Sequence, residues 1–300
     1  MPTIALVTDA ESLANDYDMP LLIEACKDVG LEAEVVRWDD EEVNWENYTS
    51  VILRSPWSYV ERLEDFILWS EKISAITALF NPLAVIKWGL NKTYLLDLRD
   101  KGVSIVPSRL IRAGHRDITA EISDFIEQQR NPSEVVIKPV VGAYSRGVRR
   151  FRTEDSDSAI SYIREQHSEG NDVLIQPYLP SIDVNGETDL VFFNGIYSHA
   201  IRKSALLQQD GTVREPLQEF RRERQPSEAE LRLASSAVNA VEEIFQLEKP
   251  LLYARIDLIL DDDNQPVVLE MEICEPSLNL PFSSGSALRF AEAIKKRLAE

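Results

Sequence analysis

Two apolar stretches, residues 253–260 and 266–274, carry acidic residues where a buried strand normally holds apolar side chains. The sequence YARIDLILDDDNQPVVLEMEICEPS that contains them is typical of two strands joined by an acidic turn. Asp257 interrupts the first apolar run. Glu270 and Glu272 stand two residues apart in the second, so both side chains point to the same face of a sheet. Any fold of this chain must therefore provide a partner for three carboxylates on facing strands.

These three carboxylates predict a divalent-cation site. Carboxylates on adjacent strands do not all ionise in a dry site without a cation. Oxygen ligands suit Mg²⁺, which typically takes one or two carboxylates together with phosphate oxygens and water. Arg255 shares a face with Asp257, where it would stabilise charge on a transferring phosphoryl group. The alternative is the solvated face of an edge hairpin, but both runs are too apolar for that, and we favour the metal site.

The charge balance and the amino terminus exclude several classes of protein. The 300 residues carry a net charge of −19, which argues against nucleic acid or an anionic membrane as the main partner. The sequence MPTIALVTDA lacks the features of a signal peptide, and no apolar stretch reaches membrane length. Two cysteines give no disulfide framework. We expect a cytoplasmic protein with a small-molecule partner, and the oligomeric state stays open, a homodimer being one option.

Residues 1–90 alternate strand and helix, which predicts an open α/β domain with a mostly parallel sheet. Strands are expected at 3–9, 32–38 and 50–54, and helices at 19–30 and 63–75. Ligands favour the loops at the carboxyl ends of such strands. In one of these loops Arg54, Trp57 and Tyr59 are candidates for holding a small carboxylated substrate. The alternative is a loop ordered by proline, with its aromatic residues packed on the domain surface.

The remaining residues predict two α+β parts. A helix at 91–102 leads into a β-rich part that ends near residue 179, and a further part runs from 180 to 300. Expected strands are 134–140, 189–195, 197–203 and the acidic pair; expected helices are 156–167, 226–248 and 286–300. The polar stretch 204–225 has little periodicity and is expected to be a mobile loop.

A glycine turn follows the strand that ends at Lys138. Gly142 and Gly147 have the spacing of a P-loop, but Val148 and Arg149 follow where Lys and Ser or Thr are required. The N–H groups of such a turn can instead cover a polyphosphate while the lysine neutralises it. The alternative is an ordinary surface strand end, and the turn alone does not decide between them.

The order of these motifs resembles the ATP-grasp superfamily over essentially the whole chain. The motifs are Lys92, VVIKP with its glycine turn, LIQPYLP, AIRK, RIDLIL and LEMEICEPS. The spacing of Asp257, Glu270 and Glu272 is similar to the Asp…Glu-x-Asn metal signature of D-alanine–D-alanine ligase and glutathione synthetase, with Glu272 in place of Asn. The resemblance implies an amino-terminal open α/β domain (1–90) followed by two α+β subdomains, a lid (91–179) and a metal-binding part (180–300), that clamp ATP.

The resemblance also implies a role for individual residues. Asp257, Glu270 and Glu272 are similar to the Mg²⁺ ligands, Arg255 to the transition-state arginine, and Arg202 and Lys203 to the residues that hold the triphosphate. Expected ATP contacts are Lys92 and Lys138 to phosphates; Gly142, Ala143, Tyr144, Ser145, Arg146 and Gly147 as the lid; Gln176, Pro177, Tyr178 and Leu179 at adenine; and Asp183 or Glu187 at ribose.

The chemistry implied by the resemblance is carboxylate activation, in which ATP forms an acyl phosphate that an amine converts to an amide. Residues 53–71, 81–98 and 272–280 resemble the group containing the ligase that closes O-ureido-D-serine to D-cycloserine. An intramolecular amine is therefore favoured. The alternatives are an intermolecular ligase of the dipeptide or glutathione-synthetase type and a nucleotide-binding module without turnover.

Substrate contacts are expected from two sides. Arg54 would hold the carboxylate side, and Asp16 or Asp18 would pair with an ammonium group. Glu275 and Ser277, just beyond the expected metal ligands, would orient the reacting end. Each of these residues has an alternative role in ordinary loop structure.

Overall fold

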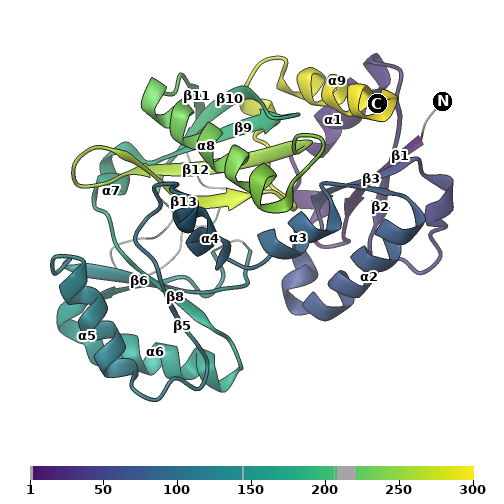
Figure 1. Cartoon of the computed structure of the whole chain (residues 1–300). Coiled ribbons are helices and arrows are strands. Elements are labelled where there is room, and N and C mark those ends of the chain that lie inside the picture. The colour runs from purple at the N-terminus through teal and green to yellow at the C-terminus, as the bar shows by residue number, and fades with distance from the viewer. Residues whose placement is uncertain (1–2, 144, 206, 208–220) are drawn as a thin grey trace.

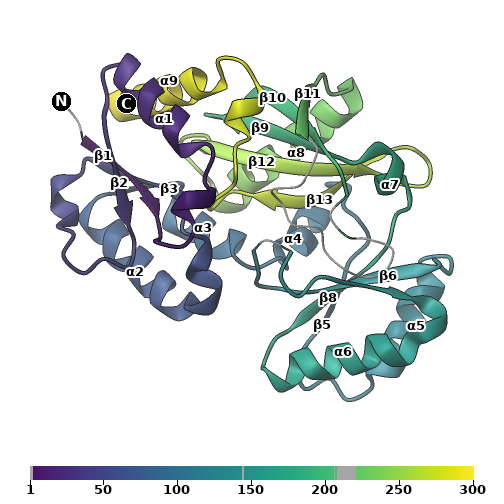
Figure 2. The ribbon, with the colours of Figure 1, turned by 180° about the vertical axis from the view of Figure 1, so that it is seen from behind.

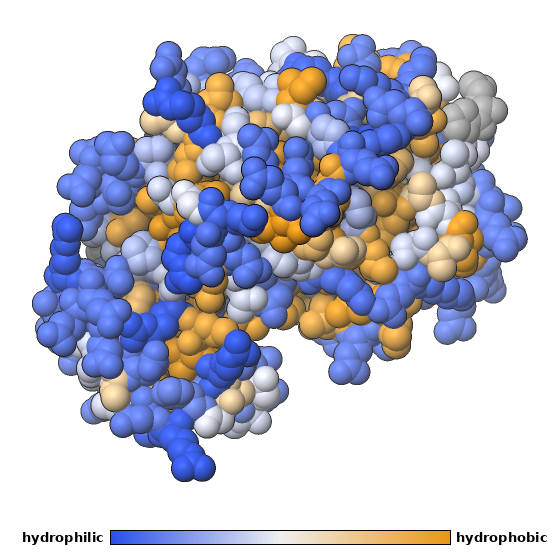
Figure 3. Space-filling model, viewed as in Figure 1, coloured by the Kyte–Doolittle hydropathy of each residue, from blue (hydrophilic) through white to orange (hydrophobic). Residues whose placement is uncertain are grey.

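The computed structural model describes residues 3–143, 145–205, 207 and 221–300, which form three sheets with helices packed against them (Figure 1). Hydrophilic residues cover much of the face seen in Figure 3. Among the described helices, none combines the length and the apolar character needed to cross a bilayer.

The amino-terminal sheet has the order β2-β1-β3-β4 with parallel pairing throughout, as the alternation of strand and helix predicts. β3 is buried along its whole length because both faces of the sheet are covered. The elements are β1 Thr3–Thr8, 3-10 helix η1 Leu13–Asn15, α1 Met19–Asp28, β2 Glu32–Arg37, η2 Trp45–Asn47, β3 Ser50–Ser55, η3 Trp57–Glu61, α2 Leu63–Ile76, β4 Ala78–Phe80 and α3 Leu83–Gly89. β4 and α3 are absent from the sequence-based prediction.

The middle sheet has the order β5-β8-β6-β7 and is antiparallel. Its helices α5 and α6 lie together on the face turned away from the carboxyl-terminal sheet (Figure 2), where Ile122, Phe125 and Ile163 form part of an apolar cluster. The elements are α4 Tyr94–Asp100, β5 Arg109–Ile111, α5 Ile118–Gln128, β6 Glu134–Pro139, β7 Arg149–Arg152, η4 Thr153–Asp155, α6 Ser156–Ser168 and β8 Val173–Pro177.

The carboxyl-terminal sheet has the order β11-β10-β9-β12-β13 and is antiparallel. Its elements are α7 Ser181–Asn185, β9 Glu187–Phe193, β10 Ile196–Lys203, β11 Arg221–Arg224, α8 Glu228–Phe245, β12 Tyr253–Leu260, β13 Pro266–Glu272, η6 Leu280–Phe282 and α9 Ser286–Ala299. The expectation of a loop over 204–225 is wrong at its end, because 221–224 pairs with β10. Most of the rest of that stretch, 206 and 208–220, lies outside the described residues.

The amino- and carboxyl-terminal sheets share one apolar core. Leu6 of β1 and Phe193 of β9 belong to the same buried cluster as Phe290 of α9, and α9 packs against α1. Tyr94 and Leu98 of α4 pack into a second cluster with α8 and the strands β12 and β13. These shared cores hold the loops of the first sheet against the end of β13. The division at residues 90 and 179 stays a prediction.

Candidate active site

One pocket receives residues from the middle and carboxyl-terminal sheets and from the loop after β3, and it contains most of the residues predicted to bind ATP, metal or substrate. Those that line it are Trp57, Tyr59, Lys92, Lys138, Gly142, Ala143, Ser145, Arg146, Gln176, Pro177, Tyr178, Leu179, Glu187, Lys203, Arg255, Asp257, Glu270, Glu272, Glu275 and Ser277. Asp16, Asp18, Arg54, Gly147, Asp183 and Arg202 are not among its described lining residues. Tyr144 lies outside the described residues.

The predicted acidic face is formed by strand pairing. Asp257 lies opposite Glu270, and Arg255 lies opposite Glu272, across the β12–β13 ladder. The guanidinium of Arg255 donates to Asp257 Oδ1 at 2.8 Å and to Glu272 Oε1 at 2.6 Å. One arginine therefore bridges two of the three predicted metal ligands.

Two lysines meet the third carboxylate. Lys138 Nζ donates to Glu270 Oε1 at 2.9 Å, and Lys92 Nζ lies 3.8 Å from the same oxygen while donating to the carbonyl of Gly142 at 2.9 Å. Burial alone would raise the pKa of Glu270, but the two ammonium groups outweigh it and hold that pKa well below its usual range. Glu270 is therefore ionised, and it gathers the two predicted phosphate-binding lysines beside the glycine turn.

Lys203 lies in a cradle of carboxylates at the end of β10. Its Nζ is 2.8 Å from Glu187 Oε2, 3.6 Å from Asp189 Oδ1 and 3.9 Å from Asp257 Oδ2. Burial would lower the pKa of Lys203, but these carboxylates outweigh it and raise that pKa well above its usual value. Lys203 is thus a permanent cation in the pocket wall.

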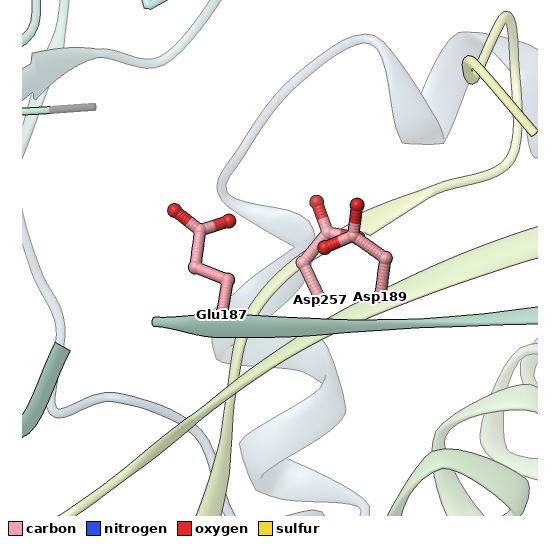
Figure 4. A group of neighbouring side chains, drawn as sticks. All are labelled: Glu187, Asp189 and Asp257. Atoms are coloured by element: carbon pink, nitrogen blue, oxygen red, sulfur yellow. The ribbon is translucent and has the colours of Figure 1, made fainter. Parts of the chain in front are cut away.

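Asp189 is a functional candidate that the sequence-based prediction lacks. One oxygen from each of Asp189, Glu187 and Asp257 lies within 4.8 Å of the other two, and Figure 4 shows the three side chains on one side of the sheet. Asp189 Oδ1 is buried and has no hydrogen-bond partner among the described residues. The available signal was its position two residues after Glu187, which places both on the same face of β9.

The donor set fits a divalent cation. Asp257, Glu270 and Glu272 all line the pocket, and their side chains offer only carboxylate oxygens, the ligands that Mg²⁺ prefers. The side chains of Glu270 and Glu272 are 24% and 35% exposed, so a cation and its water ligands can reach them from the cavity.

The region predicted to read adenine and ribose is ordered by local contacts. Gln176 Nε2 donates to Ser108 Oγ at 2.8 Å, and the hydroxyl of Tyr178 donates to Asp183 Oδ1 at 2.5 Å. Of the two candidates for ribose, Glu187 lines the pocket while paired with Lys203, whereas Asp183, on α7, accepts a hydrogen bond from Tyr178. Both candidates stay predictions.

The glycine turn reaches across to the first domain. Arg146 donates to Glu61 Oε1 of η3 at 2.6 Å, joining the turn to the loop that contains Trp57 and Tyr59. Gly147 has a φ of +71°, and a Cβ there would lie 2.8 Å from the ring of Pro139, so this position requires glycine.

Arg202 is turned away from Lys203, its neighbour on β10. Its Nη2 donates to the carbonyl of Val184 at 2.6 Å, and its Nε also bonds to the end of α7. Adjacent residues of a strand point to opposite faces, so only Lys203 reaches the carboxylates. The structure therefore does not place the predicted Arg202–Lys203 pair together.

Three predicted substrate residues are not among the described residues that line the pocket, and two of them anchor the loop 276–280. Asp18 accepts hydrogen bonds from Leu278 N at 2.5 Å and Leu280 N at 2.7 Å, and Arg54 donates to the carbonyl of Pro276 at 2.9 Å. Arg54 and Asp18 are 3.8 Å apart and fully buried. Asp16 accepts hydrogen bonds from the backbone N–H groups of residues 18 and 19 at the start of α1. Contact of these three residues with a substrate stays a prediction.

The other four predicted substrate residues, Trp57, Tyr59, Glu275 and Ser277, line the pocket. The indole N–H of Trp57 donates to the carbonyl of Glu275 at 2.9 Å, and the carbonyl of Ser277 accepts from Arg255 at 2.8 Å. The first domain thus contributes aromatic residues to the pocket, and the loop after β13 contributes polar ones.

Comparisons with known proteins agree with this arrangement. Residues 4–81 match the family model described as D-cycloserine synthetase DcsG, N-terminal domain. The cycloserine biosynthesis protein DcsG of Streptomyces lavendulae is 44% identical over 298 residues, which is 99% of each chain. The crystal structure of D-cycloserine synthetase DcsG superposes with a TM-score of 0.94 at 44% identity, again over 99% of each chain.

A more distant structure shares the fold alone. The ATP-grasp ligase PsnB, complexed with a phosphomimetic variant of its minimal precursor, Mg and ADP, matches with a TM-score of 0.66 at 16% identity over 98% of each chain. The predicted ATP-grasp fold is thereby confirmed. With 44% identity over almost its full length, this chain belongs to the DcsG family of D-cycloserine synthetases.

Proposed function

We propose that the chain is an ATP-dependent ligase that closes O-ureido-D-serine to D-cycloserine through an acyl phosphate. The observation that carries the proposal is a single pocket in which Lys92, Lys138, Lys203 and Arg255 meet the three carboxylates of the β12–β13 hairpin, in a relative of D-cycloserine synthetase. ATP phosphorylates the substrate carboxylate, and a nitrogen of the same molecule displaces phosphate. Water then cleaves the carbamoyl group from that nitrogen, which keeps a hydrogen while the group leaves as carbon dioxide and ammonia, because D-cycloserine has no carbamoyl group.

Different residues of the pocket would bind the metal ion and the nucleotide. Asp257, Glu270 and Glu272 would hold Mg²⁺, which would neutralise charge on the transferring phosphoryl group. Lys92 and Lys138 would contact the phosphates beneath the glycine turn, while residues 176–179 would contact adenine and Asp183 or Glu187 the ribose.

The transferred group passes between fixed cations. Lys203 and Arg255 are each held by buried carboxylates, so their charges point into the pocket before any substrate arrives. Charges placed in advance cost no reorganisation during the reaction, and this is how proteins accelerate phosphoryl transfer. No protein nucleophile is required.

The substrate binds on the side formed by Trp57, Tyr59, Glu275 and Ser277. These residues lie next to Glu272 and Arg255 in the same cavity, which brings a small amino acid close to the phosphoryl group. An intramolecular nitrogen has a high effective concentration, so a second amine site is not needed.

The decisive experiment uses the protein with ATP, Mg²⁺ and O-ureido-D-serine and no other amine. We expect ADP in stoichiometric amount with D-cycloserine, identified by mass spectrometry. ADP formation that strictly requires a separate amine would instead establish an intermolecular ligase. Nucleotide binding without any ADP would establish a binding module.

A second experiment tests the lid. Hydrogen exchange over residues 138–150 is expected to slow when an ATP analogue and Mg²⁺ are added, because a lid opens to admit ATP and closes over it. Unchanged exchange, with nucleotide binding proven by calorimetry, would remove the lid role from this turn.

A further inference from the structure

Asp189 lies between the two cations assigned to phosphoryl transfer. Its Oδ1 is 3.6 Å from Lys203 Nζ, and its Oδ2 is 3.8 Å from Arg255 Nε. Each cation also has a closer partner at 2.8 Å, which is Glu187 for Lys203 and Asp257 for Arg255. Asp189 thus faces both cations through different oxygens, as Asp257 does, whose Oδ1 accepts from Arg255 and whose Oδ2 is 3.9 Å from Lys203 Nζ. The side chain of Asp189 is 1% exposed, so water does not screen these interactions.

A directed chain of hydrogen bonds fixes the Asp189 carboxylate. The hydroxyl of Tyr17, which precedes α1, donates to Asn279 Oδ1 at 3.1 Å, and Asn279 Nδ2 donates to Asp189 Oδ2 at 3.1 Å. Because the amide oxygen accepts from Tyr17, the amide nitrogen must face Asp189. Burial raises the pKa of Tyr17 to about 12, so its hydroxyl keeps the proton that it donates.

Asn279 has a backbone that suits this task. It is 1% exposed and adopts the left-handed conformation with a φ of 57°, which asparagine tolerates better than most residues. The neighbouring N–H groups of Leu278 and Leu280 both donate to Asp18. The loop before α1 therefore holds Asn279 from two sides.

We propose that Asp189 is a positioning residue that keeps Lys203 and Arg255 at a fixed separation for phosphoryl transfer, and that Tyr17 and Asn279 fix its carboxylate. The inference rests on the proposed function for the role of the two cations. Its physical basis is preorganisation, since charges held in place stabilise a transition state without moving. The first domain thus acts on the reaction through hydrogen bonds, in addition to its aromatic contacts in the pocket.

The first test is Asp189→Asn, which keeps the shape and removes the charge. Lys203 and Arg255 keep Glu187 and Asp257 as partners, so we expect the KM for ATP to change less than about threefold while kcat falls roughly 100-fold, the cost of a misplacement of about 1 Å. An unchanged kcat, or a rise in KM with kcat intact, would overturn the inference.

The second test removes the links in the chain. Asn279→Gly keeps the left-handed backbone and deletes the amide, and Asn264→Gly is its matched control, because Asn264 has the same φ of 57° in the exposed β12–β13 turn. We expect kcat to fall about 10-fold for Asn279→Gly and Tyr17→Phe, as for outer partners of an active site, and to stay unchanged for the control. Equal kcat in Asn279→Gly and Asn264→Gly would contradict the chain.

A structural measurement separates this inference from the proposed function. Crystal structures of the parent protein and Asp189→Asn compare the Lys203–Arg255 separation without any turnover. We expect both side chains to shift toward Glu187 and Asp257 in the variant. If they do not move, the positioning role fails even when the parent makes D-cycloserine. If they move while the parent releases no ADP, only the proposed function fails.

Discussion

The hairpin β12–β13 and the loops of the first domain both contain charged residues that are buried or half-buried, but these residues have opposite roles. On the hairpin, Asp257, Glu270 and Glu272 line a cavity and face cations that line it too. In the first domain, Arg54 and Asp18 are sealed from solvent, form an ion pair at 3.8 Å and hydrogen-bond to the backbone of 276–280. A buried charge therefore indicates a reaction site only where a cavity gives a ligand access to it. A sealed charge anchors the chain.

The largest loss of activity is expected from a substitution at Glu270, a charged residue that lines the cavity. Glu270→Gln removes one anionic oxygen from the expected cation site and leaves Lys138 and Lys92 without their partner. Electrostatic stabilisation by a bound metal is worth several kcal/mol, so ADP release is expected to fall about 1000-fold or more. A coupled assay for ADP measures the loss. Glu154→Gln, at an exposed carboxylate that also pairs with a cation, is the control and should keep full turnover. Normal ATP hydrolysis by Glu270→Gln with substrate present would refute the metal assignment.

Substitution in the buried pair Arg54–Asp18 should lower the stability of the fold and leave turnover unchanged. Arg54→Met leaves Asp18 buried without its cation, and breaking a buried pair in this way costs about 3 kcal/mol in the free energy of unfolding. Urea unfolding followed by tryptophan fluorescence measures it. Arg62→Met, at a partly exposed arginine of the same domain, should change stability by less than about 1 kcal/mol. An Arg54→Met protein of normal stability with a raised KM for substrate would show that Arg54 contacts the substrate after all.

A pH effect tests the anchoring of the loop 276–280 from its other side. His199 Nε2 lies 2.9 Å from the carbonyl of Leu278, and burial lowers the pKa of His199 to about 4. In the unfolded chain His199 binds a proton at its ordinary pKa of 6.5, whereas in the folded chain it stays neutral until the pH approaches 4. The neutral, buried His199 therefore contributes its full stability above pH 6.5, and this stability is lost as the pH falls toward 4.

The expected size of this loss is about 2 kcal/mol between about pH 7 and about pH 4.5. Nearby charges that face His199 are Arg289, Glu223 and Asp189, and they are the same in parent and variant. Urea unfolding of His199→Gln should show a pH dependence weaker by that amount. Parallel curves for the two proteins would mean that His199 is not buried in the neutral form.

The smallest effect is expected at the surface, where the glycine turn meets a loop of the first domain. Arg146 and Glu61 join the glycine turn to η3, but both side chains are 59% exposed. Exposed ion pairs contribute about 0.2 to 1 kcal/mol, so Glu61→Gln should raise the KM for ATP by less than about fivefold. The change should disappear at high salt, since screening weakens such pairs. A larger increase that persists at high salt would indicate a buried role for Glu61.

Most of the fold could be predicted from the sequence because the apolar patterns are local. Strand and helix alternate clearly in the first domain, and the apolar face of α8 and its capping residues Ser227 and Glu230 mark that helix. β11 was not predictable in this way, because the sequence RRER has no apolar alternation and depends on pairing with β10. Helix α5 is missing from the prediction although Ile118, Ile122 and Phe125 share one face.

The candidate site was predictable where residue type and order carry the information. Lys138, Asp257 and Glu270 follow from motif order, and the structure gathers them in one pocket. Asn279 was not predictable, because its partner Asp189 is 90 residues away and neither position has a local signal. The burial of Asp18 and Arg54 was not predictable, because a sequence shows that a residue is charged and not whether a ligand reaches it.

The core shared by β1, β9 and α9 has a consequence for how the chain is made on the ribosome. Residues such as Leu6 are synthesised early, but their partner Phe290 is added almost three hundred residues later. A nascent chain that stops before α9 therefore exposes the apolar face of β1, and such faces promote aggregation. Messenger RNAs truncated before the codons for residues 286–299 should yield products that depend on chaperones or are degraded.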